Sequence, residues 1–126
     1  MRSEFLRDEN GNLRKSISCV YFLVYSGERI KIGCSANLMQ RVYELGQSMR
    51  LVSFYPIQMI GYIEFNEDLI YKAEKRMHHK FARLKIKGDY FHHHPTITEF
   101  VENNCEVRCD VFNDLLQTRN GSGHRG

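Results

Sequence analysis

The sequence predicts an α+β fold, in which a small three-stranded antiparallel β-sheet is flanked by helices. Three observations support this fold class. Residues 20–25 and 29–32 are strand-like runs on either side of a three-residue turn, which indicates a β-hairpin. Residues 59–65 form a third strand-like run. Apolar residues recur at helical spacing in residues 38–45 and in roughly 67–83, which predicts two main helices.

The hairpin leads into the first predicted helix. Residues 20–25 are apolar on both alternating faces, which is typical of a central strand covered from two sides, whereas residues 29–32 alternate between polar and apolar. Gly33 permits a sharp exit, Ser35 is suited to cap the next helix, and Gly46 ends that helix. The apolar positions of this helix are Leu38, Val42 and Leu45.

The second half of the chain continues after the third strand with a longer helix. Asn66 or Asp68 can cap this helix, and the segment KGDYF, residues 87–91, turns the chain back. Pro95 then opens a short helix that extends to about residue 103. The apolar stripe of the longer helix consists of Ile70, Ala73, Met77 and Phe81.

Length and composition indicate one domain. The 126 residues, 42% hydrophobic and 26% charged, fit a globular unit at 18–116 between a flexible N-terminal arm, 1–17, and a disordered tail, 117–126. No apolar run approaches the ~18 residues of a membrane span, and the N-terminus lacks the apolar core of a signal peptide. We therefore expect a cytoplasmic protein whose four cysteines are free thiols.

Positive charge is concentrated in one segment, although the net charge is only +3. Between residues 69 and 87, Glu74 is accompanied by a set of cations that would attract a polyanion and could contact nucleic-acid phosphates. A solvated helix face is the ordinary alternative, and it stays open. The cations are Lys72, Lys75, Arg76, Lys80, Arg83, Lys85 and Lys87.

Glu74 itself does not fit a simple surface helix. No Lys or Arg stands three or four residues from it, so the usual ion pair along a helix is not available. It also borders the apolar stripe, where an unpaired carboxylate is costly. A metal ion is one partner that would satisfy it. A pair with Arg41 of the other helix, or exposure at the edge of the stripe, is the alternative.

Tyr21, Lys31 and Arg41 each have an ordinary explanation when taken alone. Tyr21 can be a core tyrosine, Lys31 a surface lysine of its strand, and Arg41 the partner of Glu44 three residues on. Their order and spacing along the hairpin and the first helix are more informative than any one of them.

That order resembles the GIY-YIG nuclease superfamily, in a compact branch frequent in phage and viral proteins. The letters CVY, residues 19–21, stand at the first motif, and KIG, residues 31–33, stand at the second. Arg41 follows on the helix, and Glu74 lies in the segment YKAEKRMHHKFARLKIKGDYF. Leu45 stands where many members have a histidine, and His78, one turn beyond Glu74, could serve instead. The resemblance covers roughly residues 19–92.

The resemblance implies a metal-dependent DNA endonuclease that hydrolyses phosphodiester bonds. Tyr21, with its pKa lowered by Lys31, would act as general base, and Arg41 would stabilise charge on the phosphate. Glu74 would hold Mg²⁺ or Mn²⁺ against the reacting phosphate. The expected partner is DNA, with RNA as the alternative, and no membrane is expected. A homodimer or a targeting partner is a further option.

Three alternatives remain open at this point. The first is a nucleic-acid-binding module that kept the nuclease fold and lost catalysis, as Leu45 and Lys31 would favour. The second is a toxin or defence component that acts on RNA. The third is a structural zinc site built from Cys105, Cys109 and the histidines of residues 92–94, although the C-x₃-C spacing matches common zinc modules poorly.

Overall fold

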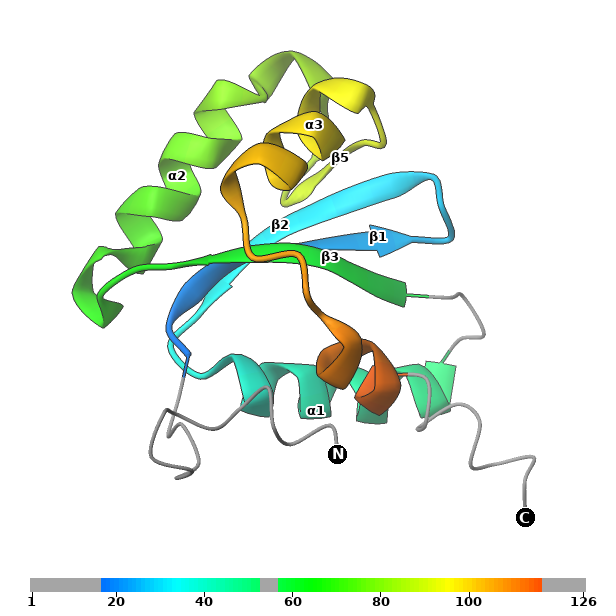
Figure 1. The fold of residues 1–126 in the computed structure, drawn as a ribbon. Coiled ribbons are helices and arrows are strands. Elements are labelled where there is room, and N and C mark those ends of the chain that lie inside the picture. Colours follow the sequence, from blue (N-terminus) through cyan, green and yellow to red (C-terminus); the bar gives the residue numbers. More distant parts are fainter. Residues whose placement is uncertain (1–16, 53–56, 117–126) are drawn as a thin grey trace.

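The computed structural model describes residues 17–52 and 57–116, which form a sheet between two helical layers (Figure 1). The sheet is antiparallel with the strand order β3-β1-β2-β5-β4. Its strands are β1 (Cys19–Tyr25), β2 (Arg29–Ser35), β3 (Ile57–Glu64), β4 (Lys85–Lys87) and β5 (Tyr90–His92). The helices are α1 (Leu38–Val52), α2 (Ile70–Lys80), α3 (Pro95–Asn104) and a final helix, residues 110–116.

The prediction of an α+β protein with a three-stranded sheet was wrong in the number of strands, because the described residues contain five. The two additional strands, β4 and β5, have three residues each and form a hairpin around Gly88 and Asp89. A run of three residues is too short to show the alternation that identifies a strand. The turn that was expected at residues 87–91 is therefore the tip of a hairpin that extends the sheet beyond β2.

The two faces of the sheet carry separate cores, since side chains alternate along each strand. On one face Tyr21 and Leu23 of β1 pack against α1 and the final helix. On the other face Phe22 and Ile32 pack against α2 and α3. In Figure 1 these helices lie on opposite sides of the sheet. The strand pattern that is apolar on both faces was thus a correct sign of a central strand.

Gly33 does not end its strand, as had been expected, but lies inside β2 opposite Tyr21 of β1. A Cβ atom at this position would lie 2.7 Å from both Cζ and the hydroxyl oxygen of Tyr21. Glycine is required here because the ring of Tyr21 lies directly over the backbone of its neighbour strand. The tyrosine ring therefore fills the space of the missing side chain.

Helix boundaries differ from the predicted ones because the capping residues differ. The side chain of Asn37, rather than that of Ser35, accepts a hydrogen bond of 3.1 Å from the amide of Gln40 and caps α1. Gly46 does not end α1, which continues to Val52. Residues 67–69 form a 3₁₀ turn before α2, which ends at Lys80.

The expected arm and tail lie outside the described residues, apart from Ile17, whose side chain is buried in the core beside α1. All four cysteines are unpaired thiols. No helix in the described residues is long and apolar enough to cross a membrane.

Candidate active site

The candidate site lies at the open half of β2. Strand β5 pairs only with the first three residues of β2, from Arg29 to Lys31, and the amide of Ile32 donates a last hydrogen bond of 3.0 Å to Asp89 O. Among the described residues, no strand pairs with residues 33–35 on that side. Helix α2 runs past this edge, so its side chains can meet those of the β4–β5 turn.

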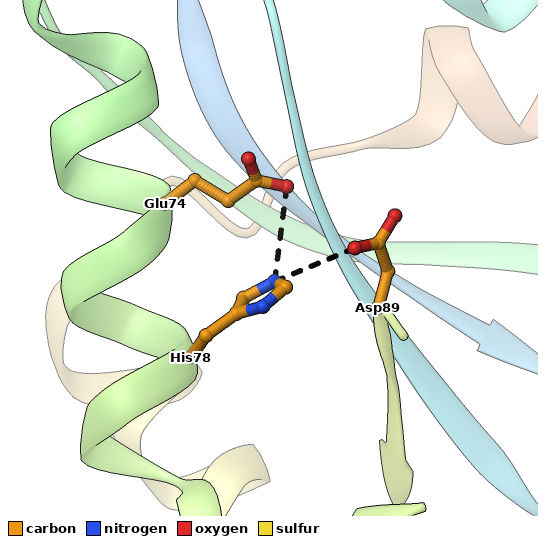
Figure 2. Close-up of side chains that lie close together, drawn as sticks. All are labelled: Glu74, His78 and Asp89. Carbon is orange, nitrogen blue, oxygen red and sulfur yellow. Dashed lines mark ion pairs between the residues drawn. The ribbon is translucent and has the colours of Figure 1, made fainter. Parts of the chain in front are cut away.

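Three potential metal ligands meet at this edge (Figure 2). Glu74 and His78 stand one turn apart on α2, and Asp89 comes from the turn before β5. His78 Nε2 lies 3.7 Å from Glu74 Oε2 and 3.9 Å from Asp89 Oδ1. One ligand atom from each residue lies within 4.8 Å of the others. This is the one such group of three or more in the described residues.

The cluster is held by contacts to β2 and β5. His78 Nε2 lies 2.9 Å from Ile32 O, and this contact joins α2 to β2. The His78 ring also packs edge-on against Phe91, with the ring centroids 5.1 Å apart. The side chains of Glu74 and His78 are 21% and 18% exposed, whereas that of Asp89 is 48% exposed. A ligand could therefore approach from the side of Asp89.

Glu74 also accepts a hydrogen bond from a thiol. Cys34 Sγ lies 3.4 Å from Glu74 Oε1. Burial, together with the charge of Glu74, raises the pKa of Cys34 to about 12, so the thiol keeps its proton. The pair between Glu74 and Arg41 that sequence reasoning considered is replaced by these contacts, since Arg41 lies 3.5 Å from Glu44 instead.

Tyr21 approaches the same region from the opposite face of the sheet. It is only 2% exposed, and burial raises the pKa of its hydroxyl to about 12. The positive charge of Arg41 lowers this pKa, whereas Cys34 and Glu74 raise it further. The pKa of Tyr21 is therefore influenced by Arg41 on its own face of the sheet and by Glu74 on the other face.

Lys31 occupies a different position from the expected one. It lies on β2 opposite Leu23 and Tyr90, half-buried, and is not among the groups that shift the pKa of Tyr21. The cation that acts on Tyr21 is Arg41. The pKa of Tyr21 is raised, contrary to the expectation that Lys31 would lower it.

The seven predicted phosphate-binding cations are all exposed and are spread over α2, the 3₁₀ turn of residues 82–84 and β4. Lys72 and Arg76 line a groove on the flank of α2 that faces Phe65, just after β3. Lys80 lies over the rings of Phe81 and Phe100. The cations nearest to Asp89 in the chain are those of the edge strand β4. The complete set is Lys72, Lys75, Arg76, Lys80, Arg83, Lys85 and Lys87.

The residues considered for zinc are not brought together. His93 Nδ1 lies 2.7 Å from Gly27 O, and His94 Nδ1 accepts a hydrogen bond from the amide of Thr96 at the start of α3. Cys109 is buried in the core beside α1, and Cys105 packs on the other core. Each of these side chains has a structural role in the fold.

Sequence reasoning missed Asp89 of the cluster and the thiol of Cys34 that contacts Glu74. Asp89 follows Gly88 in a segment that looked like an ordinary turn, and no local pattern links it to α2. Cys34 was noticed only as one of the cysteines. Only the pairing of β5 with β2 brings Asp89 to His78, and this pairing was not predicted.

The donor set fits a divalent cation. Two carboxylates supply the oxygen ligands that Mg²⁺ and Mn²⁺ prefer, and the imidazole of His78 is a ligand better suited to Mn²⁺ or another transition metal. In its present arrangement His78 Nε2 contacts Ile32 O, so the ring must release this carbonyl to coordinate an ion through that nitrogen.

A family model, described as the T5orf172 domain, matches residues 18–111. Comparison with curated proteins and with solved structures gave no match.

The resemblance to the GIY-YIG superfamily was wrong, since the matching model is that of a different family. The motifs behind it were only three residues long, and both departed from the pattern, at Cys19 and Lys31. The T5orf172 domain is a phage-associated domain of nuclease-like type, which agrees with a general function connected with nucleic acids. The match spans most of the sequence, and the chain therefore belongs to the T5orf172 domain family.

Proposed function

We propose that this protein is a metal-dependent endonuclease that hydrolyses phosphodiester bonds of DNA. The observation that carries the proposal is the cluster of Glu74, His78 and Asp89 at the open edge of β2. Tyr21 and Arg41 act electrostatically on one another close by. Phosphodiester hydrolysis requires positive charge against the phosphoryl oxygens, a positioned water and a group that accepts its proton.

Glu74 and Asp89 would hold the cation, with His78 as the third ligand. A bound divalent ion supplies positive charge against the negative charge that develops on the phosphoryl and leaving oxygens. Glu74 is positioned for this role by the thiol of Cys34, which donates to one oxygen, Oε1, while the other, Oε2, faces His78. Such a second contact fixes the orientation of a metal-binding carboxylate.

Arg41 and Tyr21 would act on the phosphate and on the attacking water. The guanidinium of Arg41 is 44% exposed and is held loosely by Glu44 at 3.5 Å, so it can turn to a phosphate. The hydroxyl of Tyr21 keeps its proton at neutral pH because its pKa is about 12. It would orient the water as a hydrogen-bonding group and accept a proton only in the small fraction of molecules that are ionised.

A binding module without catalysis is the second candidate, and the raised pKa of Tyr21 favours it. A base with a pKa far above the working pH is mostly in the wrong protonation state. Against this candidate stands Glu74, a largely buried carboxylate whose contacts are a thiol and an imidazole rather than a lysine or arginine. A carboxylate in such surroundings is costly unless a cation compensates for it.

Incubation of supercoiled plasmid with Mn²⁺ or Mg²⁺ tests the proposal. The wild-type chain should produce nicked or linear DNA, and EDTA should stop the reaction. Glu74→Gln keeps the shape of the side chain and removes its charge, so it should abolish cleavage. The matched control is Glu99→Gln, because Glu99 is an exposed glutamate of α3. Cleavage that survives in Glu74→Gln comes from a contaminant or from another site, and it contradicts the proposal.

A further inference from the structure

A second concave feature lies at the other end of β2, where the hairpin of β1 and β2 meets β5. It is a pocket of about 380 Å³, and it plays no part in the site described above. Two aromatic rings, one cation, one carboxylate and one hydroxyl line it. These residues are Tyr25, Ser26, Glu28, Arg29 and Tyr90.

Flat groups dominate the pocket. The rings of Tyr25 and Tyr90 meet edge to face, with centroids 5.5 Å apart and planes at 77°. Arg29 places its guanidinium carbon 5.9 Å from the centre of the Tyr90 ring. Burial, together with the charge of Tyr90 and a hydrogen bond to it, raises the pKa of Tyr25, so the Tyr25 hydroxyl keeps its proton. Aromatic rings and guanidinium planes are the surfaces on which nucleic-acid bases stack.

The rim of the pocket is fixed. Ser26 and Gly27 have φ angles of 54° and 70°, and the amide of Glu28 donates a 3.0 Å hydrogen bond to Tyr25 O. The side chain of His93 reaches Gly27 O at 2.7 Å, and its amide donates to Glu28 O at 3.2 Å. A pocket built in this way loses little conformational entropy when it is filled.

The pocket lies on the same face of the sheet as Tyr21. Tyr25 and Arg29 are register partners, as are Tyr21 and Gly33, and all four lie on the sheet face that carries α1. The distance along β2 from Arg29 to Gly33 is about 13 Å at 3.3 Å per residue. The charge of Arg41 and the hydroxyl of Tyr21 both act on Tyr25. Lys31 lies on this face between the two regions.

Charge decides what the pocket can hold. Arg29 and Glu28 contribute opposite charges, so the lining is close to neutral, and the carboxylate of Glu28 repels a phosphate. The same carboxylate can accept a hydrogen bond from an exocyclic amino group of a base. The occupant that fits is therefore flat, neutral and able to donate hydrogen bonds.

We infer that this pocket binds an unpaired base of the nucleic acid whose backbone lies at the candidate site. The inference rests on the proposed function, because it takes the substrate strand to pass Tyr21 and Arg41. A base within a duplex cannot enter such a pocket without leaving its stack. The protein therefore prefers substrates with a single-stranded or unstacked segment beside the reacting phosphate.

Oligonucleotide binding in EDTA tests the pocket without cleavage. Fluorescence anisotropy compares a single-stranded DNA with an abasic strand of the same length and charge. The wild type should bind the strand with bases more tightly. Tyr90→Ala should weaken that binding by roughly 5- to 100-fold and leave abasic binding unchanged, as expected for loss of stacking by one base. Arg29→Ala should act in the same direction, and it changes an exposed side chain.

Tyr43→Ala is the matched control, because Tyr43 is a 48% exposed tyrosine of α1 two positions beyond Arg41, on another flank of the helix. It should bind both strands like the wild type. Equal binding of the two strands by the wild type overturns the inference, as does an equal loss for both in Tyr90→Ala and in Arg29→Ala. Base-dependent binding without any metal-dependent plasmid cleavage would overturn the nuclease and keep the pocket. Metal-dependent cleavage without base-dependent binding would overturn the pocket and keep the nuclease.

Discussion

The contact between Tyr21 and Gly33 positions the hydroxyl of Tyr21, the proposed water-orienting group, within the sheet. The ring of Tyr21 occupies the space above Gly33, and its buried hydroxyl is influenced by the charges of Arg41 and Glu74. A larger residue at position 33 would clash with this ring. The glycine that looked like a strand exit is thus required by packing.

Replacement of Gly33 by alanine should destabilise the protein by about 1–3 kcal/mol, the usual cost of overpacking a core. The added Cβ would lie 2.7 Å from ring atoms of a tyrosine that is 2% exposed and cannot move aside. Urea denaturation measures the loss. Tyr21→Leu in the same chain should recover part of it, because the clash is removed.

Gly27→Ala is the control for this experiment. Gly27 has a φ of +70° and no atom within 4 Å of an added Cβ, so its substitution costs backbone strain and no clash. Tyr21→Leu should not rescue Gly27→Ala. Equal recovery of both glycine variants would show that the contact between Tyr21 and Gly33 is not the cause.

The raised pKa of Tyr21 has a direct consequence for the pH dependence of cleavage. The hydroxyl is protonated below pH 12, so the ionised fraction grows about tenfold for each pH unit through the neutral and alkaline range. If the phenolate accepts the proton, the cleavage rate should rise with pH from 7 to 10. Tyr21→Phe should lower the rate by about 10²–10⁴ and flatten the profile.

The measurement is the initial rate of plasmid cleavage at fixed metal concentration from pH 7 to 10, a range in which Tyr21 and Cys34 stay mostly protonated. The melting temperature at pH 7 controls for folding. If Tyr21→Phe keeps the pH slope of the wild-type rate, another group accepts the proton. His78 is then the nearest candidate in the cluster.

At the scale of elements, the hairpin of β4 and β5 determines which cations accompany the site. This hairpin carries Asp89 at its turn and Lys85 and Lys87 on the outermost strand. Lys72 and Arg76 lie on the other flank of α2, beside Phe65. We therefore expect a nucleic-acid backbone that approaches the cluster from the exposed side of Asp89 to pass β4 first.

Two double variants, each removing two positive charges, separate these surfaces. The pair Lys85→Ala and Lys87→Ala should reduce the slope of log affinity against log salt by about 2, since each lost phosphate contact contributes ~0.9 for duplex DNA. The pair Lys72→Ala and Arg76→Ala should leave the slope close to that of the wild type. DNA binding in EDTA at several salt concentrations measures both. A larger effect from the α2 pair would place the substrate on the opposite flank.

The elements also show how far the sequence alone could lead. The β1–β2 hairpin, β3, α1, α2 and α3 were predicted because each has a pattern of several residues. Strands β4 and β5 were missed because three residues carry no periodicity. The candidate site followed the same division: Glu74 stood out because no Lys or Arg lies three or four residues from it, and His78 entered only as a substitute for the histidine of the family that the sequence resembled. Asp89 and Cys34 reach them only through strand pairing and tertiary packing.

At the scale of the whole molecule, helices pack on both faces of the sheet. Helix α1 and the final helix cover β1 and β3 on one face, and α2 and α3 cover the other. Tyr21, Lys31 and the aromatic pocket follow β1, β2 and β5 on the face that carries α1. We therefore expect a single strand of nucleic acid on this face to meet the Tyr21 hydroxyl and a stacking surface.

The central claim is that Glu74, His78 and Asp89 together bind one divalent cation, and calorimetric titration with Mn²⁺ tests it most directly. The wild type should bind one Mn²⁺ per chain. Glu74→Gln and Asp89→Asn should each lose this binding, because a neutral amide is a poor substitute for a carboxylate ligand. Glu99→Gln should bind as the wild type does. Unchanged Mn²⁺ binding in Glu74→Gln or in Asp89→Asn, or no binding by the wild type, would contradict the account.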